Sequence, residues 1–330
     1  MSIKPLPTRQ RIVSLLPSAT EIICALGLQE QLVGVSHECD FPPGVEKLPA
    51  VTRTAIPKGL SSKEIDSTVN QLLQTEAALY HLNMDVLAAL KPDLIVTQAL
   101  CDVCAVSAEE VNAASCSLPG KPQVVNLEPM SLQQVFDTLS LLGEATGQQA
   151  MAQQALRGYE RRITAVRKRS ETLPPASRPR VAVLEWIDPL FNAGHWTPEL
   201  VHMAGGIDCL GNANQPSHQI PDQSLQQADP DVLLIALCGF DLERTAQDMP
   251  LLQRLPGWQE LKCVRNGQVY YTDGNAYFSR PGPRLVDSLE LLAEILQHAK
   301  TNLPLHHSSQ LSSQLSSHLI WRKYTLPNAG

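Results

Sequence analysis

Several features that define whole classes of protein are missing from this sequence. Basic residues form no stripe interleaved with aromatic residues, and 26 Lys and Arg stand against 33 Asp and Glu, for a net charge of −7. Proteins that follow a phosphate backbone need such a stripe, so we expect no nucleic-acid partner. The sequence also lacks a Gly-rich phosphate loop, a nucleophile elbow and paired carboxylates at catalytic spacing, which argues against an enzyme.

Long apolar runs are absent as well. Residues 1–10 are short and polar, and the apolar run that begins at Ile12 is interrupted by Ser14, Pro17 and Glu21. This pattern fits neither the apolar region of a signal peptide nor a membrane-spanning helix. We therefore expect no membrane span. A cytoplasmic location is expected as the sequence stands, and a periplasmic one if the true start lies upstream.

Cysteine is present but scattered. The chain has eight cysteines in 330 residues, which is long enough to bury two apolar cores without disulfides. This usage favours a reducing compartment. Cys24, Cys209, Cys238 and Cys263 are expected to be small buried apolar residues.

The first half alternates short apolar runs with helical patterns. Residues 11–16, 32–36, 93–97 and 124–127 are predicted strands, and residues 17–27 and 61–90 have helical spacing. Alternation of this kind predicts a parallel sheet that binds ligands beyond the carboxyl ends of its strands. The loops at 17–21, 37–43 and 98–104 should therefore meet at one edge.

A long helix and a second α/β segment follow. Residues 131–169 lack proline and keep helical spacing, which predicts one helix of about 55–60 Å with weak points at Gly143 and Gly147. Residues 90–96 are echoed by 228–235, which indicates two lobes of related design. The predicted domains are an N-terminal α/β lobe (1–128), a connecting helix (129–172), a C-terminal α/β lobe (173–303) and a low-complexity mobile tail (304–330).

Six segments in this order resemble the helical-backbone (class III) periplasmic binding proteins, and among them the cobalamin-binding and iron-chelate receptors of ABC transporters. The segments are residues 11–27, 35–43, 90–96, the long helix, 191–199 with 204–206, and 280–284. The resemblance implies an α/β fold of two Rossmann-like lobes with parallel sheets joined by a long rigid α-helix. It also implies a ligand held in the cleft between the lobes, an ABC transporter permease as partner, and no catalysis. Residues 52–83 look like an insertion relative to these receptors.

The resemblance implies a corrinoid or related metal chelate as ligand, with no cofactor required. A corrin ring is broad, partly apolar and edged with amides, so its receptor needs aromatic faces and polar tips. His37 could also approach the cobalt as an imidazole ligand. The residues expected to contact the ligand are Pro17, Ser18, His37, Glu38, Gln98, Trp186, Phe191, His195, Trp196, Tyr277 and Phe278.

Cys101 and Cys104 form a CxxC motif that supports an alternative function. Two thiols at this spacing can provide half of a zinc or iron site, act as a redox pair or serve packing alone. The motif follows the strand at 93–97 and should lie on the same edge as His37 and Cys39, which would complete a set of four ligands. The alternative is therefore a metal-binding protein that holds zinc or iron.

Overall fold

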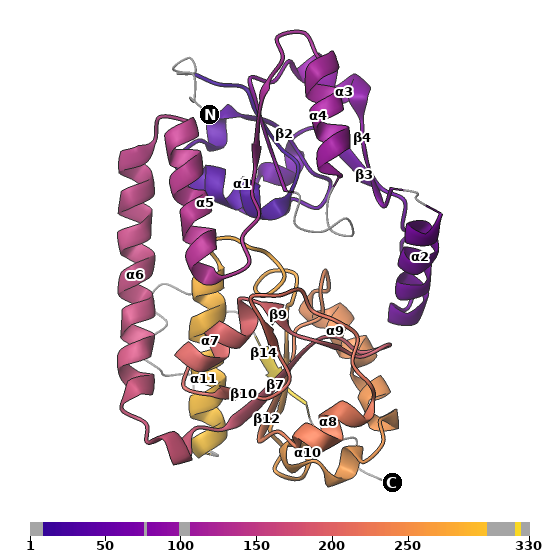
Figure 1. The fold of residues 1–330 in the computed structure, drawn as a ribbon, viewed down its shortest axis with the longest axis vertical. Coiled ribbons are helices and arrows are strands. Elements are labelled where there is room, and N and C mark those ends of the chain that lie inside the picture. The colour runs from indigo at the N-terminus through magenta and orange to yellow at the C-terminus, as the bar shows by residue number, and fades with distance from the viewer. Residues whose placement is uncertain (1–8, 76–77, 99–105, 302–320, 325–330) are drawn as a thin grey trace. The chain divides into compact units, whose positions relative to one another are not determined.

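The computed structural model describes residues 9–75, 78–98, 106–301 and 321–324 (Figure 1). They form two compact units. The first unit comprises Met1–Glu160 together with Pro281–Pro283, and the second comprises Arg161–Arg280 together with Arg284–Gly330. The predicted fold class, α/β with parallel sheets, is confirmed.

The first unit is built on a parallel sheet with strand order β2-β1-β5-β6. Alternate residues of a strand face opposite sides, so Ile12 and Val13 enter two separate apolar clusters. The predicted strands are confirmed to within a residue or two. The elements are β1 (Ile12–Ser14), α1 (Pro17–Ala25), η1 (Gln29–Gln31), β2 (Leu32–Val35), η2 (Val45–Lys47), α3 (Met84–Leu90), β5 (Leu94–Thr97), α4 (Ala108–Ser117) and β6 (Gln123–Asn126).

A hairpin occupies the segment that we interpreted as an insertion. Strands β3 (Thr52–Thr54) and β4 (Tyr80–Leu82) pair antiparallel, and helix α2 (Ser62–Gln74) lies between them in the chain. Ser61 caps α2 in a capping box with Glu64. The expectation of helix across 61–90 was wrong at β4, because cross-strand pairing with β3 outweighs the local helical spacing.

The predicted single helix over 131–169 is instead two helices, α5 (Leu132–Ala145) and α6 (Gln149–Glu171). Gly147 adopts φ +70, a left-handed conformation that ends α5, and a Cβ on Gly143 would come within 2.7 Å of the Cβ of Ala152. The two glycines therefore make a helix corner. Of these two helices, α6 continues from the first unit into the second, and its 23 residues make it about 35 Å long.

The second unit repeats the design of the first. Its sheet has the order β10-β7-β12-β13-β14, with β8 also paired to β7. Strands β10, β7, β12 and β13 are parallel, whereas β8 and β14 are antiparallel additions. The strands are β7 (Arg180–Trp186), β8 (Phe191–Asn192), β9 (Gly194–His195), β10 (Ile207–Asp208), β11 (Asn212–Ala213), β12 (Val232–Ile235), β13 (Val269–Thr272) and β14 (Trp321–Lys323).

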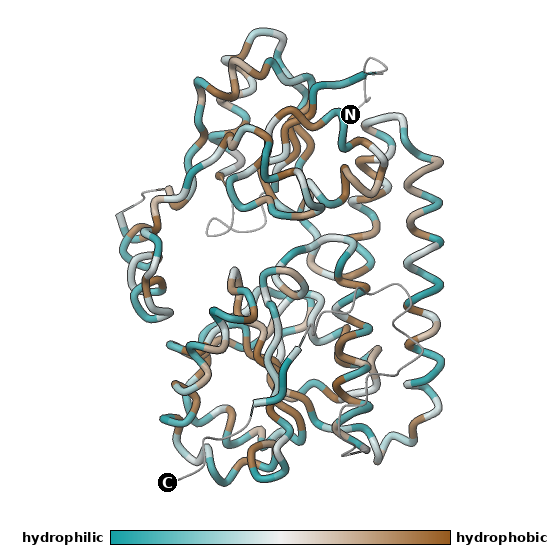
Figure 2. The backbone as a smooth tube through the Cα atoms, turned by 180° about the vertical axis from the view of Figure 1, so that it is seen from behind, coloured by the Kyte–Doolittle hydropathy of each residue, from teal (hydrophilic) through white to brown (hydrophobic). Residues whose placement is uncertain are grey.

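The helices of the second unit cover both faces of this sheet, and apolar residues concentrate along the strands (Figure 2). An ion pair joins two of the helices: Arg162 of α6 binds both Asp287 and Glu290 of α11. The helices are η3 (Pro175–Ser177), α7 (Thr197–Met203), α8 (Gln223–Ala228), α9 (Leu242–Asp248), η4 (Met249–Arg254), η5 (Trp258–Glu260), α10 (Lys262–Arg265) and α11 (Leu285–Thr301).

The two similar sequence segments, residues 90–96 and 228–235, make matching contacts in the two units. Asp93 accepts a hydrogen bond from the backbone N–H of Arg11 at 2.9 Å, and Asp231 accepts one from the backbone N–H of Arg180 at 2.8 Å. Each arginine side chain also donates to a backbone carbonyl at the end of the helix that precedes the aspartate. The acceptors are Leu90, at the end of α3, and Ala228, at the end of α8. The prediction of two lobes of related design is supported by these matching contacts.

Part of the predicted tail is ordered. Strand β14 pairs with β13, and Trp321 is 4% exposed and packs edge-on against Tyr270 with ring centroids 5.3 Å apart. Arg322 forms a fork with Glu243 on α9. The expectation of a mobile tail over 304–330 was therefore wrong at residues 321–324, because a single tryptophan buries enough apolar area to hold the strand.

Replacing Trp321 with alanine should destabilise the second unit. We expect Trp321→Ala to lower the free energy of unfolding by about 3–5 kcal/mol, because the substitution leaves a cavity beside Tyr270. Urea unfolding followed by circular dichroism measures the change. The control is Leu73→Ala on α2, where the side chain is 42% exposed and the expected change is within about 0.5 kcal/mol. Equal unfolding midpoints for both variants would contradict the docking of β14.

Candidate functional site

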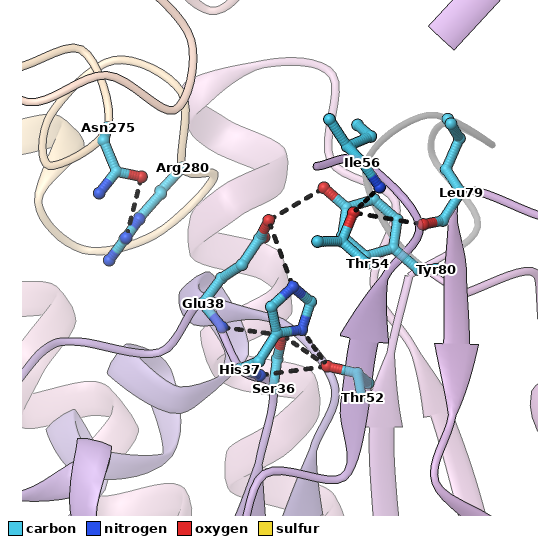
Figure 3. Close-up of polar contacts among 10 residues, drawn as sticks. All are labelled: Ser36, His37, Glu38, Thr52, Thr54, Ile56, Leu79, Tyr80, Asn275 and Arg280. Carbon is cyan, nitrogen blue, oxygen red and sulfur yellow. Dashed lines mark hydrogen bonds and ion pairs between the residues drawn. The ribbon is translucent and has the colours of Figure 1, made fainter. Parts of the chain in front are cut away.

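Polar side chains gather where β2 ends in the first unit (Figure 3). Thr52, on β3, donates from its hydroxyl to Ser36 Oγ at 3.1 Å and lies 2.7 Å from His37 Nδ1. Tyr80, on β4, donates its hydroxyl to Glu38 at 2.9 Å, and its ring lies 5.7 Å from that of His37. The hairpin thus positions the side chains of both His37 and Glu38.

The hydrogen bonds of Thr52 indicate which nitrogen of His37 carries the proton. The hydroxyl of Thr52 has one proton, and its geometry directs that proton to Ser36. This assignment makes Nδ1 of His37 the donor to Thr52 and Nε2 the unprotonated nitrogen. The nearest carboxylate oxygen on Glu38 lies 3.9 Å from Nε2, which is too long for a hydrogen bond.

The surroundings of His37 favour its neutral form. Burial lowers the pKa of the imidazole below its usual 6.5, and Lys58 acts in the same direction, whereas the charge of Glu38 opposes the shift. The side chains of His37 and Glu38 are 23% and 41% exposed. His37 is thus an accessible neutral imidazole at neutral pH.

Cys39 lies apart from His37 in its contacts. Its thiol is 4% exposed and lies 3.1 Å from the hydroxyl of Thr20, which itself donates to Ser14 at 2.8 Å. Cys39 therefore belongs to the core beneath α1. In the described ranges no three His, Cys, Asp or Glu side chains are grouped to hold a metal ion. Cys101 and Cys104 lie outside the described residues.

Four other cysteines were predicted to be buried, and they differ in exposure. Cys263 is buried as expected, Cys24 and Cys209 are half-buried, and burial raises the pKa of all three thiols to about 12. Cys238 is exposed, so the expectation of burial was wrong there. It lies three residues after the end of β12, where the chain leaves the core.

The remaining first-unit residues of the predicted site are mostly buried. Ser18 is 2% exposed, and a methyl group on Gly282 would lie 3.6 Å from its Cβ, so the Pro281–Pro283 segment covers it. Pro17 begins α1. Gln98 follows β5, is 6% exposed, and its carbonyl oxygen has no hydrogen-bond partner among the described residues. Among Pro17, Ser18 and Gln98, it is Gln98 whose side-chain carbonyl oxygen is left for another partner.

Aromatic side chains collect where the strands of the second unit end. Trp186, the last residue of β7, is half-buried, and its ring lies 5.0 Å from that of Phe240 in the loop after β12. The guanidinium of Arg244 lies 4.1 Å from the centre of the Phe240 ring and is held by Asp248 at 2.7 Å. Trp186 was predicted from the sequence, whereas Phe240 and Arg244 were not.

Two aromatic residues predicted for the site are buried. Trp196 is 4% exposed and donates its indole N–H to the carbonyl of Phe278 at 2.9 Å, and Phe278 is 1% exposed. His195 stacks on Trp196 with ring centroids 5.1 Å apart and keeps an intermediate exposure. Phe191 and Tyr277 are also half-buried. The second unit therefore presents Trp186, Phe191, His195 and Tyr277 rather than all six predicted residues.

Glu185 is a further residue that sequence reasoning missed. It precedes Trp186 on β7 and accepts the backbone N–H of Gly194 at 3.2 Å. Burial raises the pKa of its carboxyl to about 7, although the hydrogen bonds from Gly194 and Ser217 oppose the shift. Its place inside an apolar strand pattern gives the only sequence signal, a charged residue directly before a strand end.

These elements match a known family. The model of the periplasmic binding protein family matches residues 12–276. The chain belongs to this family. It is therefore a substrate-binding protein and not an enzyme, as the sequence analysis expected.

Individual relatives of this binding protein agree with that membership. The vitamin B12-binding protein of Vibrio cholerae is 24% identical over 307 residues, covering 90% of this chain and 92% of the relative. A substrate-binding lipoprotein of an ABC transporter from Bacillus subtilis is 23% identical over 86% of this chain and 79% of its own length. No helix among the described residues is long and apolar enough to cross a membrane.

Solved structures show the same fold. The crystal structure of the periplasmic vitamin B12-binding protein of Vibrio cholerae has a TM-score of 0.64 at 22% identity, covering 88% of this chain and 98% of that one. The periplasmic heme-binding protein of Roseiflexus sp. RS-1 has a TM-score of 0.66 at 22% identity, with coverage of 88% and 99%. The fold of the binding protein is therefore that of receptors with different ligands.

The imidazole of His37 should titrate below 6.5 in the folded protein. We expect Glu38→Gln to lower this pKa further, because it removes a nearby negative charge, and Lys58→Gln to raise it. NMR titration of the histidine ring resonances, with the His37 signal assigned from a His37→Gln variant, measures all three values. A pKa at or above 6.5, or shifts of the opposite sign, would show that the hairpin does not surround His37 as described.

Proposed function

We propose that this binding protein captures a corrinoid or a related metal chelate and delivers it to an ABC transporter permease. The names of several relatives support this ligand class, since they are called vitamin B12-binding or heme-binding proteins. The permease is supported by the relative described as an ABC transporter lipoprotein. Relatives named as periplasmic or as a lipoprotein support an exported protein.

The observation that carries the proposal is the state of His37. A metal-binding imidazole donates one N–H to a fixed oxygen, which orients the ring and leaves the other nitrogen as a base. We assign His37 this arrangement, because Nδ1 lies 2.7 Å from the hydroxyl of Thr52, which is itself the donor to Ser36. The lowered pKa keeps Nε2 available at neutral pH. We propose that Nε2 coordinates the metal at the centre of the chelate.

The polar neighbours of His37 suit the rim of a macrocycle. Glu38 is 41% exposed and held by Tyr80, and carboxylates accept hydrogen bonds from amide side chains of the kind that edge a corrin. Gln98 offers an unpaired carbonyl oxygen for the same purpose. These residues supply orientation, and the imidazole supplies the bond to the metal.

We assign the second unit the apolar contacts. Trp186, Phe191, His195 and Tyr277 are half-buried aromatic side chains at or near the ends of its strands. A half-buried aromatic ring retains apolar area that a flat ligand can cover. The alternative of a resident zinc or iron ion is not favoured, because Cys39 bonds to Thr20 in the core rather than lying with His37.

Replacing His37 with alanine should remove a specific spectroscopic signal. Aquocobinamide has no nucleotide base of its own, so binding to the wild-type protein should replace a cobalt-bound water with imidazole and shift its visible absorption. We expect His37→Ala to bind at least about tenfold more weakly, which corresponds to about 1.4 kcal/mol, and to lose the shift. Isothermal titration and absorption spectroscopy provide the two readouts, with hemin titrated in parallel to separate cobalt from iron chelates.

The matched control is His81→Ala. His81 neighbours Tyr80 on β4 but, by strand alternation, faces the opposite side of the hairpin. The His81→Ala variant should bind aquocobinamide as the wild-type protein does. An identical absorption shift in His37→Ala would exclude the imidazole as the metal ligand, and the absence of binding by every chelate would exclude the function.

The aromatic contribution of the second unit can be tested separately. Trp186→Ala should weaken binding by about 1–2 kcal/mol through lost apolar contact, without changing the absorption of the bound chelate. Trp186→Phe retains a ring and should lose less than half of that. Titration calorimetry measures both. Equal affinity of wild type and Trp186→Ala would remove Trp186 from the site.

A further inference from the structure

A pocket lies in the second unit, away from the strand ends discussed above. It has a volume of about 330 Å³. Gly267 and Val269 line it at the point where β13 begins, whereas Tyr277 follows the other end of the same strand. The pocket is thus at the amino ends of the parallel strands. Its lining residues are Trp258, Val264, Arg265, Gly267, Val269, Lys323 and Tyr324.

The charged side chains among the described residues that line this pocket are all positive. Among the residues that the structure describes, Arg265 and Lys323 are its only ionisable groups besides the hydroxyl of Tyr324, and no carboxylate lines it. Lys323 crosses over the turn before β13, since a methyl group on Gly267 would lie 3.7 Å from its ammonium nitrogen. Among the described residues neither Arg265 nor Lys323 forms an ion pair within 4.0 Å. Two cations that line one pocket without a counter-charge among the described residues favour an anionic occupant.

The remaining walls are apolar or aromatic. Val264 and Val269 are 7% and 2% exposed, and Trp258 is 2% exposed. The indole N–H of Trp258 is buried and has no acceptor in the described part of the chain. An unpaired buried donor is costly and normally has a partner. The walls therefore suit a ligand that has an apolar body as well as an anionic group.

The C-terminal segment forms one wall of the pocket. Lys323 is the last residue of β14, and Tyr324 accepts a hydrogen bond at its hydroxyl from Gln253 at 2.6 Å. The backbone N–H of Tyr324 bonds to Val269 at 2.8 Å. The pocket is complete only when this segment is docked. A ligand held there must therefore stabilise the docked segment.

We propose that this pocket binds a small organic anion, a carboxylate carried on an aromatic or aliphatic body, and that the bound anion holds the C-terminal segment on β13. Arg265 and Lys323 contact the carboxylate, and the valines and aromatic rings contact the body. The site is independent of the proposed function, because it lies at the opposite ends of the strands.

The experiment titrates the full-length protein with benzoate by calorimetry and follows tryptic cleavage after Arg322 and Lys323. Benzyl alcohol has the same ring without charge, and inorganic phosphate has charge without an apolar body. We expect benzoate to bind at least tenfold more tightly than either and to slow cleavage at both residues. Arg265→Gln with Lys323→Gln should weaken benzoate binding at least tenfold.

A control variant carries the same change of charge elsewhere. Lys47→Gln with Arg157→Gln removes two cations from the first unit and should bind benzoate as wild type does. Trp258→Phe, which keeps the ring but not the N–H, provides a second test and should weaken binding with little change of fold by circular dichroism. The proposal is overturned if benzoate does not bind, if benzyl alcohol or phosphate binds equally well, or if the Arg265 and Lys323 variant retains wild-type affinity.

Discussion

One carboxylate in each unit fixes the register on which the binding surfaces depend. Asp93 and Asp231 each follow a proline and accept a backbone N–H where the first strand begins, from Arg11 just before β1 and from Arg180 at the start of β7. The bond ties the first strand to the third, so their carboxyl ends finish together. A slip of one residue would reverse every side chain of the strand between core and surface. Trp186 and Gln98 are at the strand ends because this register holds.

The sequence allowed this framework to be predicted because its signals are local. Branched apolar runs marked β1 and β5, and the echo of residues 90–96 at 228–235 indicated the duplication. The helix corner was not predicted, since Gly143 and Gly147 weaken a helix in the same way whether it bends or ends. The left-handed conformation of Gly147 ends α5, and the close approach of Ala152 to Gly143 packs α6 against it, a contact that spacing within one helix does not reveal.

The site was predictable in part for the same reason. His37 and Glu38 follow a strand directly, so strand-end reasoning found them, whereas Thr52 and Tyr80 belong to the segment treated as an insertion. Their contacts span 15 and 42 residues of sequence. The burial of Trp196 was not predicted, because an aromatic residue in a loop motif has the same sequence signature whether it faces a ligand or the core. Its bond to Phe278, 82 residues away, decides the matter.

The two titrating groups beside the strand ends respond to pH with opposite signs. The pKa of Glu185 is raised to about 7 by burial, so its protonated form favours folding, and that stability is lost as the pH rises through about 7. The pKa of His37 is lowered, so its neutral form favours folding, and that stability is lost as the pH falls below 6.5. Acidification from neutral pH thus removes the negative charge of Glu185, whereas the lowered pKa of His37 delays protonation of its imidazole. Because a protonated imidazole cannot coordinate a metal, the buried position of His37 extends the pH range over which Nε2 can serve as a ligand.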